Sequence, residues 1–136
     1  MDDELIDRKL ESLQRCLIRV RERCPQTVAA LEDDVDAQDV VVLNLSRAVQ
    51  ICVDLALHQL SVTHQPAPDT MGQAFEALVA AGFLVPELGL RLRKAVGFRN
   101  LAVHNYDTMR WDMVHAIATR HLDDFTAFAR CFVRSS

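Results

Sequence analysis

Three side chains suited to phosphate chemistry lie close together in residues 99–106 (RNLAVHNY). The guanidinium of Arg99 can bind a phosphate, the imidazole of His104 can move a proton, and the phenol of Tyr106 offers a hydroxyl that can be modified. Together they suit chemistry on RNA. Each also has a plainer interpretation, because cations at a helix end offset the helix dipole and a lone tyrosine usually packs against its neighbours.

A helix from Pro86 to about His104 must position these groups. Proline suits the first turn of a helix, and apolar residues recur at helical spacing on the side expected to face the core. These inward residues are Leu88, Leu92, Ala95 and Val96.

On the outer side of that helix, residues three or four apart share a face, which aligns Arg93, Gly97, Asn100 and His104. Gly97 leaves this face open. Arg99 lies about 140° from His104, because each residue of a helix turns about 100°. Three arrangements can bring the two together: the long Arg99 side chain swings round, the helix unwinds before His104, or a second copy of the chain supplies the missing group.

Charge is unevenly distributed along the chain. The net charge is −4, which argues against nucleic-acid binding by the molecule as a whole. Residues 91–99, however, contain four cations and no acid, whereas residues 32–39 contain five acids and no base. We therefore expect Arg91, Arg93 and Lys94 to bind RNA phosphates beside Arg99, with a solvated helix face as the alternative.

The rest of the chain also predicts helices. We expect a first helix over about 3–22, a loop or short turn over 25–34, a second helix to about Val62, and a linker at 64–68. In the second helix Asp36 is the expected N-cap, with Asp39 as its acidic partner and Val35 and Val40 as a hydrophobic staple. That helix is apolar on several sides, which indicates a central or interface position.

Two further helices follow. One begins at the Thr70 capping box and ends at Gly82, and a last one runs from roughly Met109 to Val133 with His121 on its apolar stripe and Trp111 as a core or interface anchor. No strand pattern is found. The expected fold class is all-α: one domain over residues 1–136, forming a mainly antiparallel bundle of about five helices.

Composition narrows the protein class. Half of the residues are hydrophobic and a quarter are charged, as in ordinary globular domains. No apolar run approaches the roughly 20 residues of a membrane helix and the first residues are acidic, so we expect a cytoplasmic protein without membrane contact. The four cysteines form no CxxC pair, and no histidine completes a zinc site, so we expect mostly buried, reduced thiols, no metal and no cofactor. These cysteines are Cys16, Cys24, Cys52 and Cys131.

The spacing of Arg99, Asn100 and His104 resembles the motif of the HEPN superfamily: Arg, a polar residue, three more positions, then His. With Tyr106 it becomes Arg-x4-His-x-Tyr, which is similar to the motif of HepT-like toxins of the HepT/MntA toxin–antitoxin system. Chain length and helix order agree with this family, so the resemblance covers nearly the whole chain.

The resemblance implies a homodimeric, metal-independent endoribonuclease with its cleft at the dimer interface. His104 would exchange a proton with the ribose 2′-hydroxyl or the leaving oxygen, and Arg99 would stabilise the charged phosphate. Asn100 would orient the phosphate or the His104 imidazole by hydrogen bonding. Tyr106 would receive AMP from an MntA-like nucleotidyltransferase antitoxin, which would silence the enzyme. Two alternatives remain open: a non-catalytic module that binds nucleotide or RNA together with a nucleotidyltransferase, and a helical adaptor that only pairs with another protein.

Overall fold

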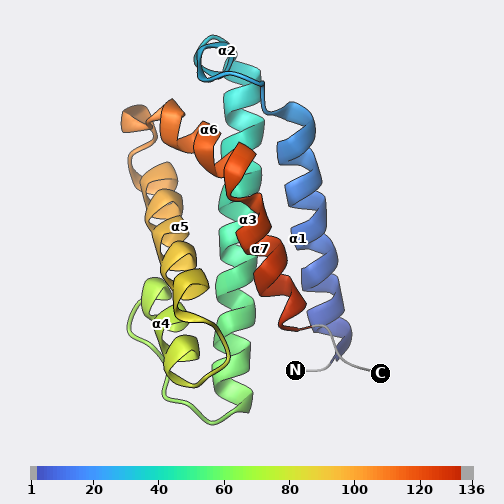
Figure 1. Ribbon diagram of the computed structural model, residues 1–136, viewed down its shortest axis with the longest axis vertical. Helices are drawn as coiled ribbons and strands as arrows, with labels where there is room; N and C mark the ends of the chain where they lie inside the picture. Colours follow the sequence, from blue (N-terminus) through green and yellow to red (C-terminus); the bar gives the residue numbers. More distant parts are fainter. Residues whose placement is uncertain (1–2, 133–136) are drawn as a thin grey trace.

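The computed structural model describes residues 3–132, and all regular secondary structure in this range is helical (Figure 1). This confirms the expected all-α bundle, although the described range contains seven α-helices in place of about five. In chain order they are α1 (Asp3–Arg23), α2 (Val28–Glu32), α3 (Val35–Val62), α4 (Met71–Ala80), α5 (Pro86–His104), α6 (Trp111–Arg120) and α7 (Leu122–Arg130), with the short 3-10 helix η1 (Tyr106–Thr108) between α5 and α6.

Helix α3 forms the centre of the bundle and contacts each of the other six α-helices (Figure 1). Leu45, Cys52 and Ala56 along it are completely buried. This central position explains why α3 is apolar on several sides without requiring an interface. It is also long and apolar enough to cross a membrane by length and composition alone, but 56% of its most apolar window is buried inside the bundle, as in a core helix.

The junction before α3 differs from the expectation. Residues 25–34 are not only a loop, because α2 lies within them, capped by the Thr27 side chain. Helix α3 begins at Val35, and its N-cap is Asp34, whose carboxylate accepts a hydrogen bond from the Ala37 amide at 3.0 Å. The assignment of Asp36 as N-cap was wrong, as was the hydrophobic staple, because Val35 is 65% exposed.

A side chain on α3 explains the earlier start of this helix. The Gln38 amide nitrogen donates to the main-chain oxygens of Leu31 and Glu32, at 2.9 and 3.1 Å. These bonds tie the end of α2 to the first turns of α3 and leave room for only a two-residue connection. Asp34 and Asp36 both have a side chain suited to an N-cap, so N-cap preferences alone do not predict which of them begins the helix.

The signals around α4 and α5 are confirmed. Thr70 caps α4 by accepting a hydrogen bond from the Gln73 amide, and Gly82 follows the helix with a φ of 80°, a conformation that glycine adopts without strain. Pro86 lies in the first turn of α5. The two helices pack closely where Gly89 faces Val79, since a Cβ at Gly89 would overlap a Val79 methyl group.

The expected last helix is two helices, α6 and α7, separated at His121 (Figure 1). The side chain of His121 is 51% exposed, so its placement on the core stripe was wrong. Asp123 and Asp124 lie in the first turn of α7, where acidic side chains stabilise a new helix N-terminus. The chain can therefore change direction and still bury Phe125 and Phe128. Helix α7 ends at Arg130, and the predicted end at Val133 lies outside the described residues.

Candidate functional site

Helix α5 continues through His104 and ends there, with the Asn105 amide donating to the Leu101 carbonyl at 2.8 Å. Unwinding before His104 is therefore excluded as the way to bring it to Arg99. Arg93, Gly97, Asn100 and His104 are all exposed. A Cβ at Gly97 would meet no atom of a neighbouring element within 4 Å, so this face of α5 is open at Gly97 as expected.

Arg99 lies on a different side of α5 and is half-buried. Its Nη1 donates a hydrogen bond to Asn100 Oδ1 at 3.3 Å, which fixes the guanidinium toward Asn100. Within residues 3–132 no hydrogen bond or ion pair joins Arg99 to His104. One copy of the chain therefore presents the two groups on separate sides of one helix, and a swing of the Arg99 side chain or a second copy remains as the way to unite them.

The other cations of α5 have carboxylate partners on neighbouring helices. Arg91 Nε lies 2.8 Å from Asp124 Oδ1 on α7, and Arg93 forms an ion pair with Glu76 on α4. The charges within residues 91–99 did not predict these ion pairs, because the two carboxylates lie on other helices that pack against α5. The Arg93–Glu76 pair is exposed, and exposed ion pairs contribute little free energy, so a phosphate can replace Glu76 at modest cost. The Asp124 side chain that pairs with Arg91 is only 16% exposed.

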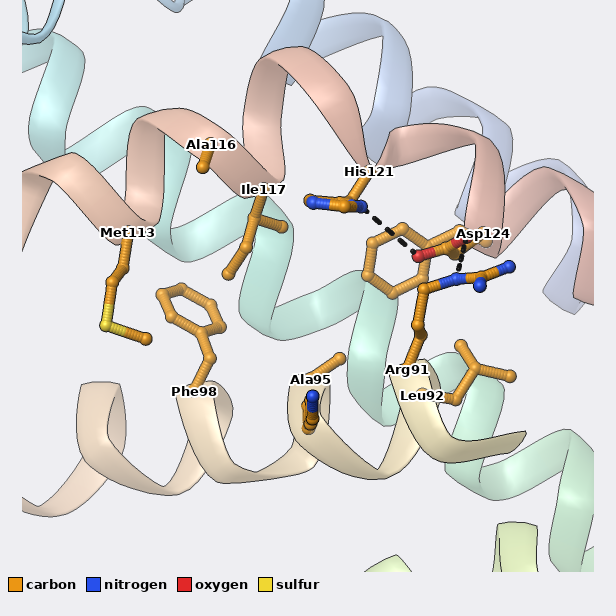
Figure 2. Close-up of a pocket in the computed structure, with 11 residues that line it drawn as sticks. Arg91, Leu92, Ala95, Phe98, Met113, Ala116, Ile117, His121 and Asp124 are labelled. Carbon is orange, nitrogen blue, oxygen red and sulfur yellow. Dashed lines mark hydrogen bonds and ion pairs between the residues drawn. The ribbon is translucent and has the colours of Figure 1, made fainter. Parts of the chain in front are cut away.

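A cavity of about 350 Å³ lies between α5 and the α6–α7 pair (Figure 2). Its walls are mostly apolar and include Leu92, Phe98 and Ile117. At one end Asp124 bridges Arg91 and His121, whose Nδ1 lies 3.8 Å from Asp124 Oδ2 (Figure 2). Lys94 also lines the cavity, whereas Arg99 and His104 do not.

Tyr106 lies on η1, directly after α5, and contacts two other elements. Its hydroxyl donates a hydrogen bond to Asp39 Oδ1 on α3 at 2.9 Å, and its ring packs edge-on against Trp111 with ring centroids 6.0 Å apart. Burial, together with the Asp39 carboxylate, raises the pKa of Tyr106 to about 12. The phenol is therefore neutral at physiological pH, and Tyr106 remains 36% exposed.

Sequence reasoning missed the contact between Asp39 and Tyr106. It assigned Asp39 to the start of a helix, but α3 already begins at Val35, which places Asp39 beyond the first turn. The two residues are 67 positions apart, and no pattern in either segment indicates the other. Trp111 is partly buried against the core, which agrees with its expected role as an anchor.

Comparison with known proteins matches most of the chain to one family. The family described as Ribonuclease HepT-like matches residues 13–132. The chain belongs to the HepT-like family. A curated relative of this HepT-like chain, the mRNA nuclease HepT of Shewanella oneidensis, is 30% identical over 126 residues, which cover 93% of the chain and 94% of the relative.

Solved structures of toxin–antitoxin complexes resemble the HepT-like chain along nearly its full length. A toxin–antitoxin complex with AMP-PNP superposes with a TM-score of 0.90 and 29% identity, covering 95% of this chain and 97% of the other. The tri-AMPylated Shewanella oneidensis HEPN toxin in complex with MNT antitoxin superposes with a TM-score of 0.88 and 30% identity, covering 96% and 97%. The all-α fold and the HEPN resemblance are thereby confirmed.

The remaining histidines and cysteines of the HepT-like chain divide between buried and exposed positions. His115 Nε2 lies 2.9 Å from the Pro25 carbonyl oxygen, and burial raises the pKa of the Cys16 thiol. Cys52 is fully buried, but Cys131 is exposed, unlike the mostly buried thiols expected from the sequence. Within the described range no group of three or more His, Cys, Asp or Glu side chains is arranged to hold a metal ion.

Proposed function

We propose that this HepT-like chain is a cytoplasmic toxin that cuts RNA without a metal ion, as a homodimer whose cleft contains Arg99 and His104. The supporting observation is the geometry of α5. His104 ends an open helix face, while Arg99 lies on another side of the same helix and is held toward Asn100. A two-fold arrangement of two such helices can place His104 of one copy opposite Arg99 of the other.

The proposed reaction is attack of the ribose 2′-hydroxyl on the neighbouring phosphate. His104 accepts the hydroxyl proton as the new O–P bond forms, and the leaving 5′ oxygen takes a proton from the imidazolium so produced. The products are a 2′,3′-cyclic phosphate and a free 5′-hydroxyl. Arg99 stabilises the extra negative charge on the phosphorus centre, while Asn100 orients the guanidinium to which it is hydrogen-bonded.

The remaining cations of α5 have an accessory role in this proposal. Arg91, Arg93 and Lys94 bind the RNA backbone on either side of the cut, with Arg91 and Arg93 exchanging their carboxylate partners Asp124 and Glu76 for phosphates. Within this proposal these side chains hold the RNA backbone and do not touch the reacting atoms. Their contribution should therefore appear mainly in RNA affinity and its salt dependence.

A nucleotidyltransferase antitoxin of the MntA type neutralises the toxin in this proposal by transferring AMP to Tyr106. Support comes from the exposure of Tyr106, its position two residues past His104, and the AMPylated state of the Shewanella toxin in its complex. Each AMP adds an anionic phosphodiester and an adenine close to the end of α5. The tethered nucleotide then competes with RNA for the same cations.

Incubation of purified protein with total RNA and excess EDTA tests the cleavage. Wild-type protein should produce fragments ending in cyclic phosphate, and His104→Ala should cut at least 100-fold more slowly, as expected for loss of a general acid–base group. His121→Ala is the matched control, because His121 is another exposed histidine but lies outside the motif. If both wild type and His104→Ala bind RNA and neither cuts, the chain is a non-catalytic RNA-binding module.

A further inference from the structure

The hydrogen bond between Tyr106 and Asp39 joins two elements that meet beside the end of α5. The phenol oxygen lies 2.9 Å from Asp39 Oδ1, and the ring is flanked by Trp111 at the start of α6. Tyr106 is 36% exposed, yet these contacts hold the direction of its hydroxyl. The atom that would receive AMP is therefore already paired with a carboxylate.

We infer that Asp39 positions the hydroxyl of Tyr106 for nucleotidyl transfer and accepts its proton as the new bond forms. This inference rests on the proposed modification of Tyr106 and extends it, by assigning a residue of the toxin itself to that reaction. A general base must lie within hydrogen-bond reach of the proton it removes, and Asp39 meets that condition.

In the transfer, the phenol oxygen attacks the α-phosphorus of a nucleoside triphosphate. A bond forms between that oxygen and phosphorus, the bond from phosphorus to the bridging oxygen breaks, and pyrophosphate leaves. The phenolic proton passes to the Asp39 carboxylate. This transfer is needed because burial and Asp39 keep Tyr106 protonated well above neutral pH.

The same contact cannot survive the modification. A phosphodiester of Tyr106 has no hydroxyl hydrogen to donate, and it carries a negative charge that Asp39 repels once that carboxyl returns its proton to water. The modified turn should therefore separate from the first turns of α3. Thus the Asp39 carboxylate assists the transfer and, once Tyr106 carries AMP, disfavours the original contact between η1 and α3.

The charges around this pair do not supply an alternative base. Asp36 lies one turn before Asp39 on α3, Asp107 follows Tyr106 on η1, and Arg110 is paired with Asp112 at the start of α6. His104 ends α5, two residues before Tyr106. For residues 3–132, Asp39 is the one ionisable group with a hydrogen bond to the phenol.

Tyr106 is the single tyrosine and Trp111 the single tryptophan of the chain, so AMP on tyrosine and a change in tryptophan fluorescence each report on one residue. Wild type, Asp39→Asn, Asp39→Ala and the control Asp36→Asn are incubated with magnesium, labelled ATP and the small nucleotidyltransferase expected to be encoded beside this chain. Intact mass measures AMP addition as a function of time, from about pH 6.5 to pH 10. Asn keeps an acceptor oxygen at position 39 but removes the base, whereas Ala removes both.

We expect Asp39→Asn to slow AMP addition by on the order of 100-fold near pH 7, with the deficit shrinking toward pH 10, because the phenol of this variant, no longer beside a carboxylate, begins to ionise without a base. Asp36→Asn should match wild type, and AMP addition should change Trp111 fluorescence as the turn leaves α3. Equal rates for Asp39→Asn and wild type at every pH would overturn the role of Asp39 while leaving the proposed function intact. No AMP on wild type would overturn the proposed neutralisation together with this inference.

Discussion

Two glycines on α5 give opposite predictions for the same substitution. A Cβ at Gly97 would meet no atom within 4 Å, whereas a Cβ at Gly89 would overlap a methyl group of Val79. Alanine loses less backbone freedom than glycine when a helix forms, so Gly97→Ala should stabilise the protein by about 1 kcal/mol.

At Gly89 the same gain is offset by crowding. Val79 is β-branched and has little rotamer freedom in a helix, so α4 and α5 must move apart to admit the new methyl group. Overpacking of this kind costs about 1–3 kcal/mol. Gly89→Ala should therefore be neutral to destabilising by about 2 kcal/mol, which separates the two variants by roughly 1–3 kcal/mol.

Urea denaturation followed by far-UV circular dichroism measures the difference. With a denaturant slope of about 1–3 kcal/mol per molar, a gain of about 1 kcal/mol moves the Gly97→Ala midpoint up by roughly 0.3–1 M. Gly89→Ala should stay at the wild-type midpoint or fall below it. Equal destabilisation by both substitutions would refute the open space at Gly97, because it would mean that another surface, such as that of a second copy, already covers this position.

Three further predictions follow from local contacts. In absorbance at 295 nm the single tyrosine, Tyr106, should titrate near pH 12 in wild type and closer to pH 10 in Asp39→Ala. Folding raises the pKa of Tyr106, so the stability that the protonated phenol contributes is complete below about pH 10 and is lost as the pH rises through 12. A titration unchanged by Asp39→Ala would contradict the hydrogen bond between the two residues. Thr70→Ala should lower the free energy of unfolding by about 1 kcal/mol in thermal or urea denaturation through loss of the α4 cap, whereas Thr70→Ser should not. A thiol reagent should modify the exposed Cys131 before the fully buried Cys52, as read by peptide mass mapping, and the reverse order would contradict the described burial.

Much of the fold could be predicted because its signals are local. Thr70 and Gly82 delimit α4, and Pro86 opens α5, each through chemistry contained within a few residues. Where two neighbouring residues suit the same local role, the sequence does not indicate which of them takes it. Asp34 and Asp36 both suit an N-cap, and only the bonds of Gln38 to the end of α2 select the first.

The motif residues that define the candidate site are visible in the sequence, but the side chains that surround them are not. The spacing of Arg99, His104 and Tyr106 is visible in the sequence, and the helix face that ends at His104 lies where its periodicity predicts. The carboxylates that pair with this region belong to helices distant in sequence. Asp39 is the clearest case, since a single side-chain hydrogen bond from η1 to α3 joins it to Tyr106.

The most direct test of the central claim mixes two inactive variants. Arg99→Ala and His104→Ala are co-refolded so that their copies exchange, and RNA cutting is measured in excess EDTA. If each site combines Arg99 of one copy with His104 of the other, half of the dimers are mixed and each keeps one intact site, so the mixture should recover about a quarter of wild-type activity. A mixture as inactive as either variant alone would contradict a cleft shared between two copies.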